Sequence, residues 1–256
     1  GTMKKLLAIT ALSAALFFGQ TAAAEEKAAE EVKPSHVEMV LVLDESGSMS
    51  NLTNDTIGGF NSMIEKEKKL DVDAHVTTVL FNDQYKMLYN RRELKDVRKM
   101  TDKDYTPGGM TALLDAVGRT IHKMDMVSGI HRKDKGNKVL FVIITDGEEN
   151  DSREYTYADV KKLIKDRQEN AGWEFIFLGA NIDAAAAAEN LGIDRDRAVK
   201  YKNTGSGVRA NFKAVAELSD SLAKSGRVSD EWKETVEKDE DDAADKQSAA
   251  VTLHRR

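Results

Sequence analysis

The sequence predicts an α/β fold with three layers: a doubly wound, mostly parallel sheet with one antiparallel edge strand and helices on both faces. Three observations predict it. Short, near-continuous apolar runs recur along the chain, as expected for strands that are covered on both faces. Segments with apolar residues at helical spacing separate these runs. The connections are short, and regular β/α alternation with short connections is typical of a parallel sheet flanked by helices.

The first part of the chain contains signals for three strands and two helices. The first strand is a near-continuous apolar run, and the helix after it carries apolar residues on one face. The second strand ends at Asn82-Asp83, which favours a tight turn into an antiparallel edge strand. A Pro-Gly-Gly loop then precedes a helix with apolar residues at helical spacing. In order, we expect these elements at 37–43, 52–69, 74–81, 85–89 and, after the loop at 105–110, in a helix opened by Thr111.

The second part continues the alternation. The most apolar strand of the chain ends on Thr145-Asp146-Gly147, and a helix and another central strand follow. Asp183 is expected to cap an alanine-rich helix that ends at Gly192. A short strand and a final helix complete the series. The expected elements are the strand 139–144, the helix 157–170, the strand 174–178, the alanine-rich helix, the strand 198–201 and a helix that includes 212–222.

Composition excludes several kinds of chemistry. The chain has 256 residues, a formal net charge of -6 and no cysteine. Without cysteine there are no thiol nucleophiles, disulfides or cysteine-ligated metals. An acidic protein is not expected to have nucleic acid or an anionic membrane as its main partner. Length and hydrophobic content suffice for one sizeable domain.

The N-terminal segment has the order of a secretory signal. Lys4-Lys5 precedes an apolar run that is too short for a comfortable transmembrane helix, and Ala22-Ala23-Ala24 offers a cleavage site. Gly1-Thr2 is interpreted as a cloning remnant before this signal. We therefore expect a secreted, periplasmic or cell-envelope protein that is not inserted in the membrane after cleavage. The expected segments are the remnant plus signal at 1–24, a linker at 25–35, one domain at 36–226 and a charged, disordered tail at 227–256.

Three polar loops are expected at the carboxyl edge of the sheet, where such folds bind ligands. The first strand ends in Asp44-Glu45-Ser46-Gly47-Ser48, Thr111 lies in the glycine loop, and Asp146 ends the fourth strand. The sequence separations are 63 residues from Ser48 to Thr111 and 35 from Thr111 to Asp146. Clustered oxygen donors of this type bind hard divalent cations.

This constellation resembles the metal-ion-dependent adhesion site of von Willebrand factor type A domains. All five positions of that pattern are present, and the order of strands and helices agrees with the domain. The resemblance implies a Mg²⁺ site, with Mn²⁺ or Ca²⁺ as alternatives, that completes its coordination with an Asp or Glu carboxylate of a partner protein. The predicted metal residues are Asp44, Ser46, Ser48, Thr111 and Asp146.

The chemistry of these side chains agrees with that interpretation. Serine and threonine hydroxyls are neutral ligands, so they leave much of the charge of the cation uncancelled. Asp44 and Asp146 can orient bound water from an outer position. Each residue also has a simpler interpretation, because Asp, Ser and Thr commonly cap helices and Asp-Gly commonly forms turns. The neighbouring acidic residues are expected on a solvated rim and the neighbouring methionines in packing: Glu45, Glu148, Glu149, Met49 and Met110.

The histidines show no spacing typical of metal ligands, so surface or packing roles are expected for His36, His75, His122, His131 and His254. The leading functional hypothesis is an exported, divalent-cation-dependent protein-binding module that is not an enzyme. One alternative is a metal-assisted phosphohydrolase that uses Asp44 as nucleophile, although Ser46 stands where such enzymes need a second acid. Another is an intracellular scaffold that works with an ATPase. No oligomeric state is predicted.

Overall fold

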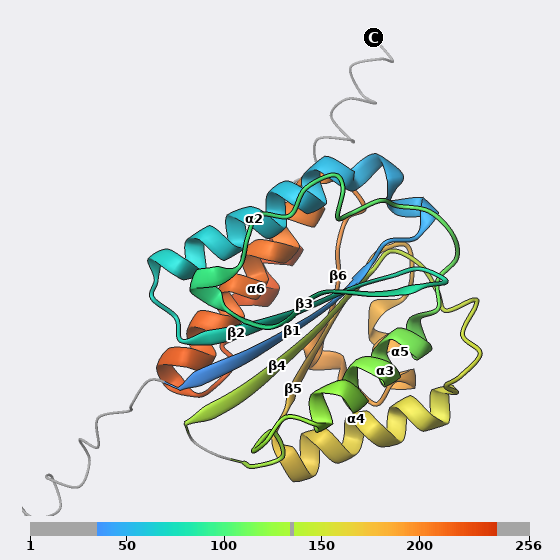
Figure 1. The fold of residues 1–256 in the computed structure, drawn as a ribbon. Helices are drawn as coiled ribbons and strands as arrows, with labels where there is room; N and C mark the ends of the chain where they lie inside the picture. The colour runs from blue at the N-terminus through green and yellow to red at the C-terminus, as the bar shows by residue number, and fades with distance from the viewer. Residues whose placement is uncertain (1–34, 134–135, 240–256) are drawn as a thin grey trace, which may run out of the picture. The chain divides into compact units, whose positions relative to one another are not determined.

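The computed structural model describes residues 35–133 and 136–239. Within these residues a six-stranded sheet has the order β3-β2-β1-β4-β5-β6. Every neighbouring pair is parallel except β2 with β3, which pair in the antiparallel sense at one edge. The predicted α/β fold, with a mostly parallel sheet and one antiparallel edge strand, is confirmed (Figure 1).

The observed elements follow the expected alternation. The strands are β1 (His36–Asp44), β2 (Ala74–Phe81), β3 (Tyr85–Glu93), β4 (Asn137–Thr145), β5 (Glu174–Gly179) and β6 (Ala198–Lys200). The α-helices are α2 (Thr53–Lys69), α3 (Leu113–Asp125), α4 (Tyr157–Ala171), α5 (Ala184–Asn190) and α6 (Gly205–Ser225). Short 3-10 helices cover Gly47–Leu52, Leu94–Asp96 and Arg195–Arg197.

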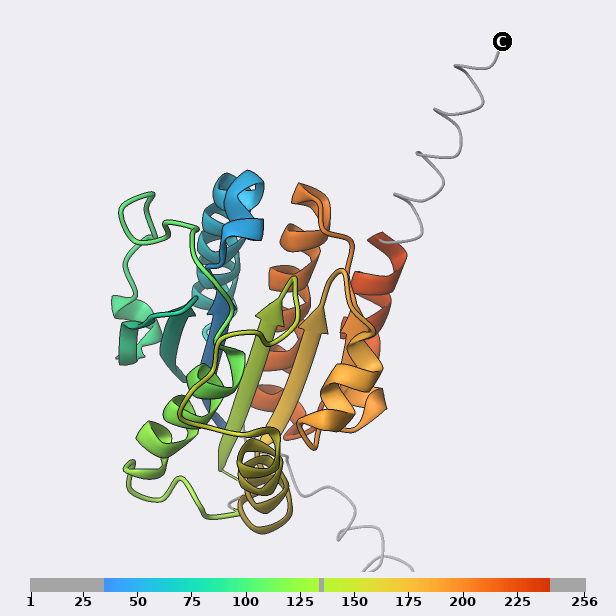
Figure 2. The same ribbon diagram turned by 90° about the vertical axis from the view of Figure 1, so that its right-hand side faces the viewer.

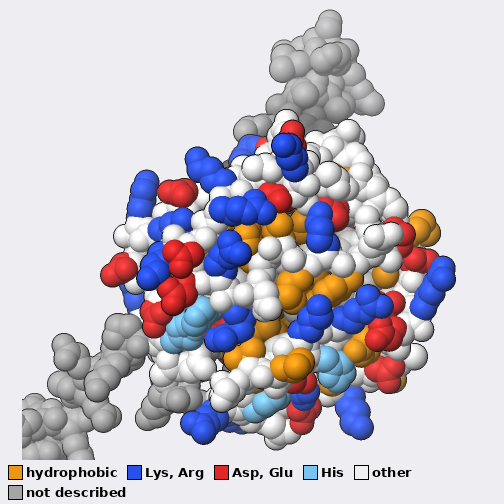
Figure 3. Space-filling model, viewed as in Figure 1, with side chains coloured by type: hydrophobic (Ala, Val, Ile, Leu, Met, Phe, Trp, Pro, Cys, Tyr) orange, Lys and Arg blue, Asp and Glu red, His pale blue; other side chains and the backbone are white. Residues whose placement is uncertain are grey.

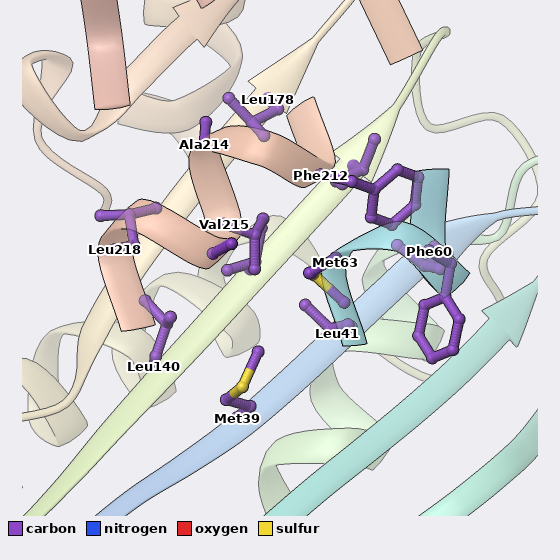
Figure 4. Packing of buried hydrophobic residues seen from close by; sticks show 14 of the residues in the cluster. Met39, Leu41, Phe60, Met63, Leu140, Leu178, Phe212, Ala214, Val215 and Leu218 are labelled. Carbon is purple, nitrogen blue, oxygen red and sulfur yellow. The ribbon is translucent and has the colours of Figure 1, made fainter. Parts of the chain in front are cut away.

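Helices cover both faces of the sheet, with α2 and α6 on one face and α3, α4 and α5 on the other (Figures 1 and 2). Side chains alternate between the faces along a strand. In β1, Met39 and Leu41 therefore belong to the apolar cluster on the face covered by α2 and α6. Val40 and Val42 belong to the apolar cluster on the other face. Figure 4 shows the first of these clusters, in which Phe60 of α2 and Phe212 of α6 belong to the same layer.

The ends of α4, α5 and α6 carry residues that typically begin or end helices. The side chain of Asp183 caps α5 by accepting a hydrogen bond of 3.1 Å from the amide of Ala186, as predicted. Thr156 and Asp159 form a reciprocal capping box at the start of α4. α4 and α6 each end before a glycine in the left-handed conformation.

Two elements differ from the sequence-based expectation. β3 extends to Glu93 instead of ending at residue 89, because its pairing with β2 resumes after a bulge in which Asn90 and Arg91 lie opposite Thr77. α3 begins at Leu113, with Ala112 as its N-cap, so Thr111 does not open the helix.

The C-terminal part of the domain also differs. Residues 231–239 fall in the segment expected to be a charged tail, but they are helical and bury Trp232 and Val236 completely. The predicted signal, the linker up to residue 34 and the rest of the tail from 240 lie outside the described residues. No helix in the described part of the chain is long and apolar enough to cross a membrane.

Candidate metal centre

Asp44 lies at the carboxyl end of β1, beside the end of β4. The register of these two strands pairs Leu43 with Ile144, so Asp44 and Thr145, the last residues of the two strands, are neighbours. Thr145 donates a hydrogen bond of 2.7 Å from its hydroxyl to Oδ2 of Asp44, and the amide of Ser46 donates one of 2.7 Å to Oδ1. Both carboxylate oxygens are thus held, and Asp44 is almost completely buried.

The two serines connect the end of β1 to the end of β4. The hydroxyls of Ser46 and Ser48 are 3.1 Å apart, and Ser48 donates a hydrogen bond of 2.7 Å to Oδ1 of Asp146. The other oxygen of Asp146, Oδ2, is buried and has no hydrogen-bond partner among the described residues. Because Ser48 is exposed while Ser46 and Asp146 are buried, the cluster opens to solvent on the Ser48 side.

Backbone hydrogen bonds hold the glycine loop against the serine loop. The amide of Gly47 donates to the carbonyl of Gly109 at 3.1 Å, and the amide of Gly108 donates to the carbonyl of Glu45 at 2.9 Å. Gly109 has a φ of 75°, which favours glycine. This loop therefore brings Thr111 to the carboxyl ends of the strands, where Asp44 lies.

A second set of hydrogen bonds ties Thr111 to the loop after β4. Its amide donates to the side chain of Asn150 at 2.8 Å, and the amide of Asn150 donates to the carbonyl of Thr111 at 3.0 Å. Thr111 is 5% exposed. All three predicted loops therefore meet at the carboxyl ends of the strands, although they are distant in the sequence.

The helix-capping roles considered for Ser46 and Thr111 are not observed. Ser46 occupies the N-cap position of the 3-10 helix Gly47–Leu52, but its side chain makes no capping hydrogen bond. α2 has Leu52 as its N-cap, and α3 has Ala112. The hydroxyls of Ser46 and Thr111 are therefore not committed to helix capping.

Two neighbours of the site were expected in other roles. Glu45 is 6% exposed instead of lying on a solvated rim, and its carboxylate accepts a hydrogen bond of 2.9 Å from the amide of Thr106. Met110 is 49% exposed instead of packed, whereas Met49 is buried as expected. Glu45 thus anchors the glycine loop, and Met110 presents an apolar side chain beside the site.

Sequence reasoning missed three supporting residues. Thr145 holds Asp44, Asn150 holds the backbone of Thr111, and the buried hydroxyl of Tyr105 donates a hydrogen bond of 2.6 Å to the carbonyl of Asp44. The position of Thr145 in Thr-Asp-Gly was a usable signal. Tyr105 and Asn150 carried none, because their role depends on how the loops fold back.

The site carries excess negative charge. Burial, and then the charge of Asp44, raise the pKa of Asp146 above its usual range. Burial and the charge of Asp44 also raise the pKa of Tyr105. Neither Asp44 nor Asp146 forms an ion pair with a described lysine or arginine. A divalent cation would offset this charge.

The donor set fits a hard cation. Every side chain of the predicted site offers oxygen, which suits Mg²⁺, Mn²⁺ or Ca²⁺. The buried Oδ2 of Asp146 is an acceptor with no donor in the described chain, which is the condition that a bound ion or its water would satisfy. The residues present thus fit the implied metal.

Solved structures share this fold at low sequence identity. The pilus adhesin SpaC from Lactobacillus rhamnosus GG has a TM-score of 0.58 and 15% identity, covering 76% of this chain and 31% of that chain. The PilB minor pilin from Streptococcus sanguinis has a TM-score of 0.53 and 12% identity, covering 74% and 62%. Proximal thread matrix protein 1 from the mussel byssus, solved with a zinc-occupied MIDAS motif, has a TM-score of 0.51 and 12% identity, covering 74% and 47%.

These likenesses concern the fold alone, and the chain spans less than two thirds of each of these proteins. No curated protein matches the chain. A family described as the vWA found in the TerF C terminus matches residues 36–193, a range that contains β1 to α5 and all five residues of the predicted site. The chain therefore belongs to the vWA-TerF-like family.

Proposed function

We propose that this protein is an exported protein-binding module whose affinity for its partner depends on a divalent cation, with Mg²⁺ as the expected ion. Ser46, Ser48 and Thr111 would supply neutral ligands to the metal, and Asp44 and Asp146 would hold its remaining water molecules. The partner would contribute an Asp or Glu carboxylate. Bound Mg²⁺ supplies a positive centre whose charge the neutral hydroxyls leave largely uncancelled.

One observation carries the proposal: a buried carboxylate oxygen, Oδ2 of Asp146, has no donor, and it belongs to a cluster whose Ser48 hydroxyl is open to solvent. Leaving a buried charged acceptor without a partner is costly. A cation with its water removes that cost, and the exposed side leaves room for a ligand from another protein.

The protein residues have distinct tasks in this proposal. Thr145 and the amide of Ser46 fix the carboxylate of Asp44, so its orientation does not change when an ion arrives. Glu45 and Asn150 hold the glycine loop at the same edge. The site is therefore organised before binding, which lowers the entropic cost of taking up the ion and the partner.

Met110 supports a protein partner. Its side chain is half exposed beside Thr111, and methionine is enriched in protein interfaces because its flexible thioether adapts to different surfaces. An acidic side chain on the metal and an apolar neighbour on Met110 together describe a peptide or protein surface better than a small anion.

The placement of Asp44 disfavours the phosphohydrolase alternative. A carboxylate nucleophile needs a free oxygen that faces the substrate. Both oxygens of Asp44 accept hydrogen bonds from within the chain, and the residue is 1% exposed. The non-enzymatic proposal therefore agrees better with its surroundings.

Export is proposed from the sequence alone, because the basic, apolar and small-residue order of residues 3–24 lies outside the described part of the chain. The measurement is fractionation of cells that produce the full chain. We expect the processed protein outside the cytoplasm, and a cytoplasmic, full-length product would favour the scaffold alternative.

The binding proposal is tested with the double variant Ser46→Ala/Ser48→Ala. Calorimetry should show that the parent binds one Mg²⁺ and that the variant does not. Capture of partners from an envelope extract should depend on Mg²⁺ and be lost with a chelator or in the variant.

The matched control is Ser50→Ala, a neighbouring serine whose hydroxyl bonds the backbone of its own loop. It should bind Mg²⁺ as the parent does. Equal Mg²⁺ affinity in the parent and in the double variant would refute the site, whereas metal binding without any Mg²⁺-dependent capture would refute the adhesive role alone.

A further inference from the structure

A second group of potential ligands lies at the opposite end of β1 from the predicted Mg²⁺ site. His36 and Glu38 are two residues apart on β1, and β2 places His75 beside Glu38 in the strand register. The eight residue-to-residue steps from His36 to Asp44 correspond to about 26 Å of strand. This group is therefore separate from the cluster around Asp44.

The three side chains meet on one face of the sheet. Alternation along β1 places His36 and Glu38 on the same face as Val40 and Val42, which is the face covered by α3 and α4. The two imidazoles are partly exposed, at 20% for His36 and 28% for His75, while the side chain of Glu38 is 2% exposed. Figure 3 shows histidine side chains at the surface next to acidic ones.

The distances within the group match those of metal ligands. Nε2 of His36 lies 3.0 Å from Nδ1 of His75 and 3.3 Å from Oε1 of Glu38. Nδ1 of His75 lies 3.2 Å from the same oxygen. Ligands of tetrahedral zinc, at about 2.0–2.1 Å from the metal, are about 3.3–3.4 Å from one another. An ion about 1 Å out of the plane of the three atoms would thus reach all of them.

The tautomer of His36 is set by a neighbouring carboxylate. Its other ring nitrogen, Nδ1, lies 3.1 Å from Oδ1 of Asp73. A hydrogen bond from Nδ1 to that carboxylate leaves the lone pair on Nε2, which faces the group. This is the outer arrangement that accompanies most histidine ligands of metals.

Arg91 holds Glu38 in place. The bulge in β3 gives Arg91 a φ of 45°, and its guanidinium pairs with the carboxylate of Glu38. Arg91 donates to Oε1, the oxygen that faces the histidines, and a carboxylate oxygen has two lone pairs, so Arg91 and an ion can share it. Asn137 of β4, in register with His36, has a buried side-chain oxygen without a hydrogen-bond partner among the described residues.

We propose that His36, Glu38 and His75 form a zinc site at the amino ends of β1 and β2, with water in the fourth position. A set of two imidazoles and one carboxylate binds Zn²⁺ in preference to Mg²⁺. The ligands come from two neighbouring strands, so the ion would cross-link β1 to β2. The proposal departs from the expectation that His36 and His75 have only surface or packing roles.

The test is a titration of the full chain with Zn²⁺ in the presence of excess Mg²⁺, which occupies the oxygen site. We expect one Zn²⁺ per chain by calorimetry, and Co²⁺ as a probe should give the absorption bands of a tetrahedral site. His36→Gln and His75→Gln should each weaken Zn²⁺ binding by about 100-fold or more, because loss of even an outer partner costs 10–100-fold. Asp73→Asn should weaken it by about tenfold.

Two controls separate this site from the predicted Mg²⁺ site. His122→Gln removes an exposed histidine that also lies near a carboxylate, 3.7 Å from Asp125, and should leave Zn²⁺ affinity unchanged. Ser46→Ala/Ser48→Ala should also leave it unchanged. Circular dichroism and the melting temperature without metal check that each variant is folded.

The proposal is overturned if the parent binds no Zn²⁺ while Mg²⁺ is present, or if folded His36→Gln and His75→Gln variants bind it as tightly as the parent. Loss of Zn²⁺ binding in the double serine variant alone would place the ion at the carboxyl edge and would also overturn the proposal.

Discussion

Ser48 donates a hydrogen bond of 2.7 Å to Asp146, and the two residues are 98 positions apart in the sequence. This bond satisfies one oxygen of Asp146 and leaves the other buried without a partner. The carboxylate is therefore destabilised as long as no cation is near, because burial and the charge of Asp44 both disfavour its ionised form.

Asp146→Asn should stabilise the metal-free protein and abolish its response to Mg²⁺. The pKa of Asp146 is raised in the folded state, so its contribution to stability is present at low pH and is lost as the pH rises through that raised pKa. Asparagine keeps the shape without the charge. The measurement is the melting temperature at neutral pH with a chelator and with Mg²⁺.

Glu148→Gln, at an exposed position in the same loop, is the control and should respond to Mg²⁺ as the parent does. A metal-free Asp146→Asn protein that melts below the parent would show that the buried carboxylate does not destabilise the folded protein.

Glu67→Gln should remove a pH dependence of stability that has nothing to do with the metal. Burial in α2 raises the pKa of Glu67 from 4.5 to about 8. The folded state keeps the proton while the unfolded state loses it above pH 4.5, so stability falls between these values, by about 3 kcal/mol at pH 7. The glutamine variant should show a flatter profile in denaturant titrations at pH 4.5, 6 and 8.

Glu65→Gln, an exposed position on the same helix, should keep the slope of the parent. Parallel profiles for the parent and Glu67→Gln would mean that the pKa of Glu67 in the folded protein is not raised.

Gly109→Ala should disturb the glycine loop, whereas Gly108→Ala should not. At a φ of 75° an alanine costs about 1–2 kcal/mol, and its Cβ would lie 2.0 Å from a carboxylate oxygen of Asp83. A Cβ at Gly108 meets nothing within 4 Å. Calorimetry should therefore show weaker Mg²⁺ binding for the first variant only, and equal effects of both would argue against the role of this backbone conformation.

Met110→Ser should weaken capture of the partner without changing Mg²⁺ affinity, because this side chain is exposed beside the site but offers no hard ligand. Met126→Ser is the matched control, since Met126 is 86% exposed and follows the far end of α3. The measurement is Mg²⁺-dependent binding to the captured partner. If both variants bind it equally well, Met110 is not part of the interface.

Trp232→Ala should destabilise the domain by about 3–5 kcal/mol, the usual cost of removing a buried tryptophan. The exposed Glu234→Ala on the same helix should have little effect. Chemical denaturation measures both. A loss below about 1 kcal/mol for Trp232→Ala would indicate that the helix at 231–239 contributes little to the fold.

The strands of the sheet could be predicted from the sequence because buried parallel strands are apolar along their whole length. β2 was predicted at its observed bounds, and α4 within one residue. The bulge in β3 was not predictable, because Asn90 and Arg91 are ordinary edge-strand residues and their displacement depends on Thr77 of the partner strand. The helix at 231–239 was missed because its abundant charges concealed two buried apolar positions.

The two proposed ion sites differ in the same way. The five residues of the predicted Mg²⁺ site stand at or just after the ends of strands or in the glycine loop, so the meeting of these loops could be inferred from strand ends although they are distant in the sequence. His36 and His75 are 39 residues apart and become neighbours only through the register of β1 with β2. The usable signal was positional: both histidines stand at the start of strands that pair in parallel, and Glu38 shares the face of His36.

β1 lies between β2 and β4 and is hydrogen-bonded along its length on both sides. Its amide protons should therefore exchange with solvent only when the whole domain unfolds, later than those of the edge strands β3 and β6. Asp44 is the last residue of this strand, so the carboxylate at the centre of the proposed Mg²⁺ site should keep its position with or without a bound ion.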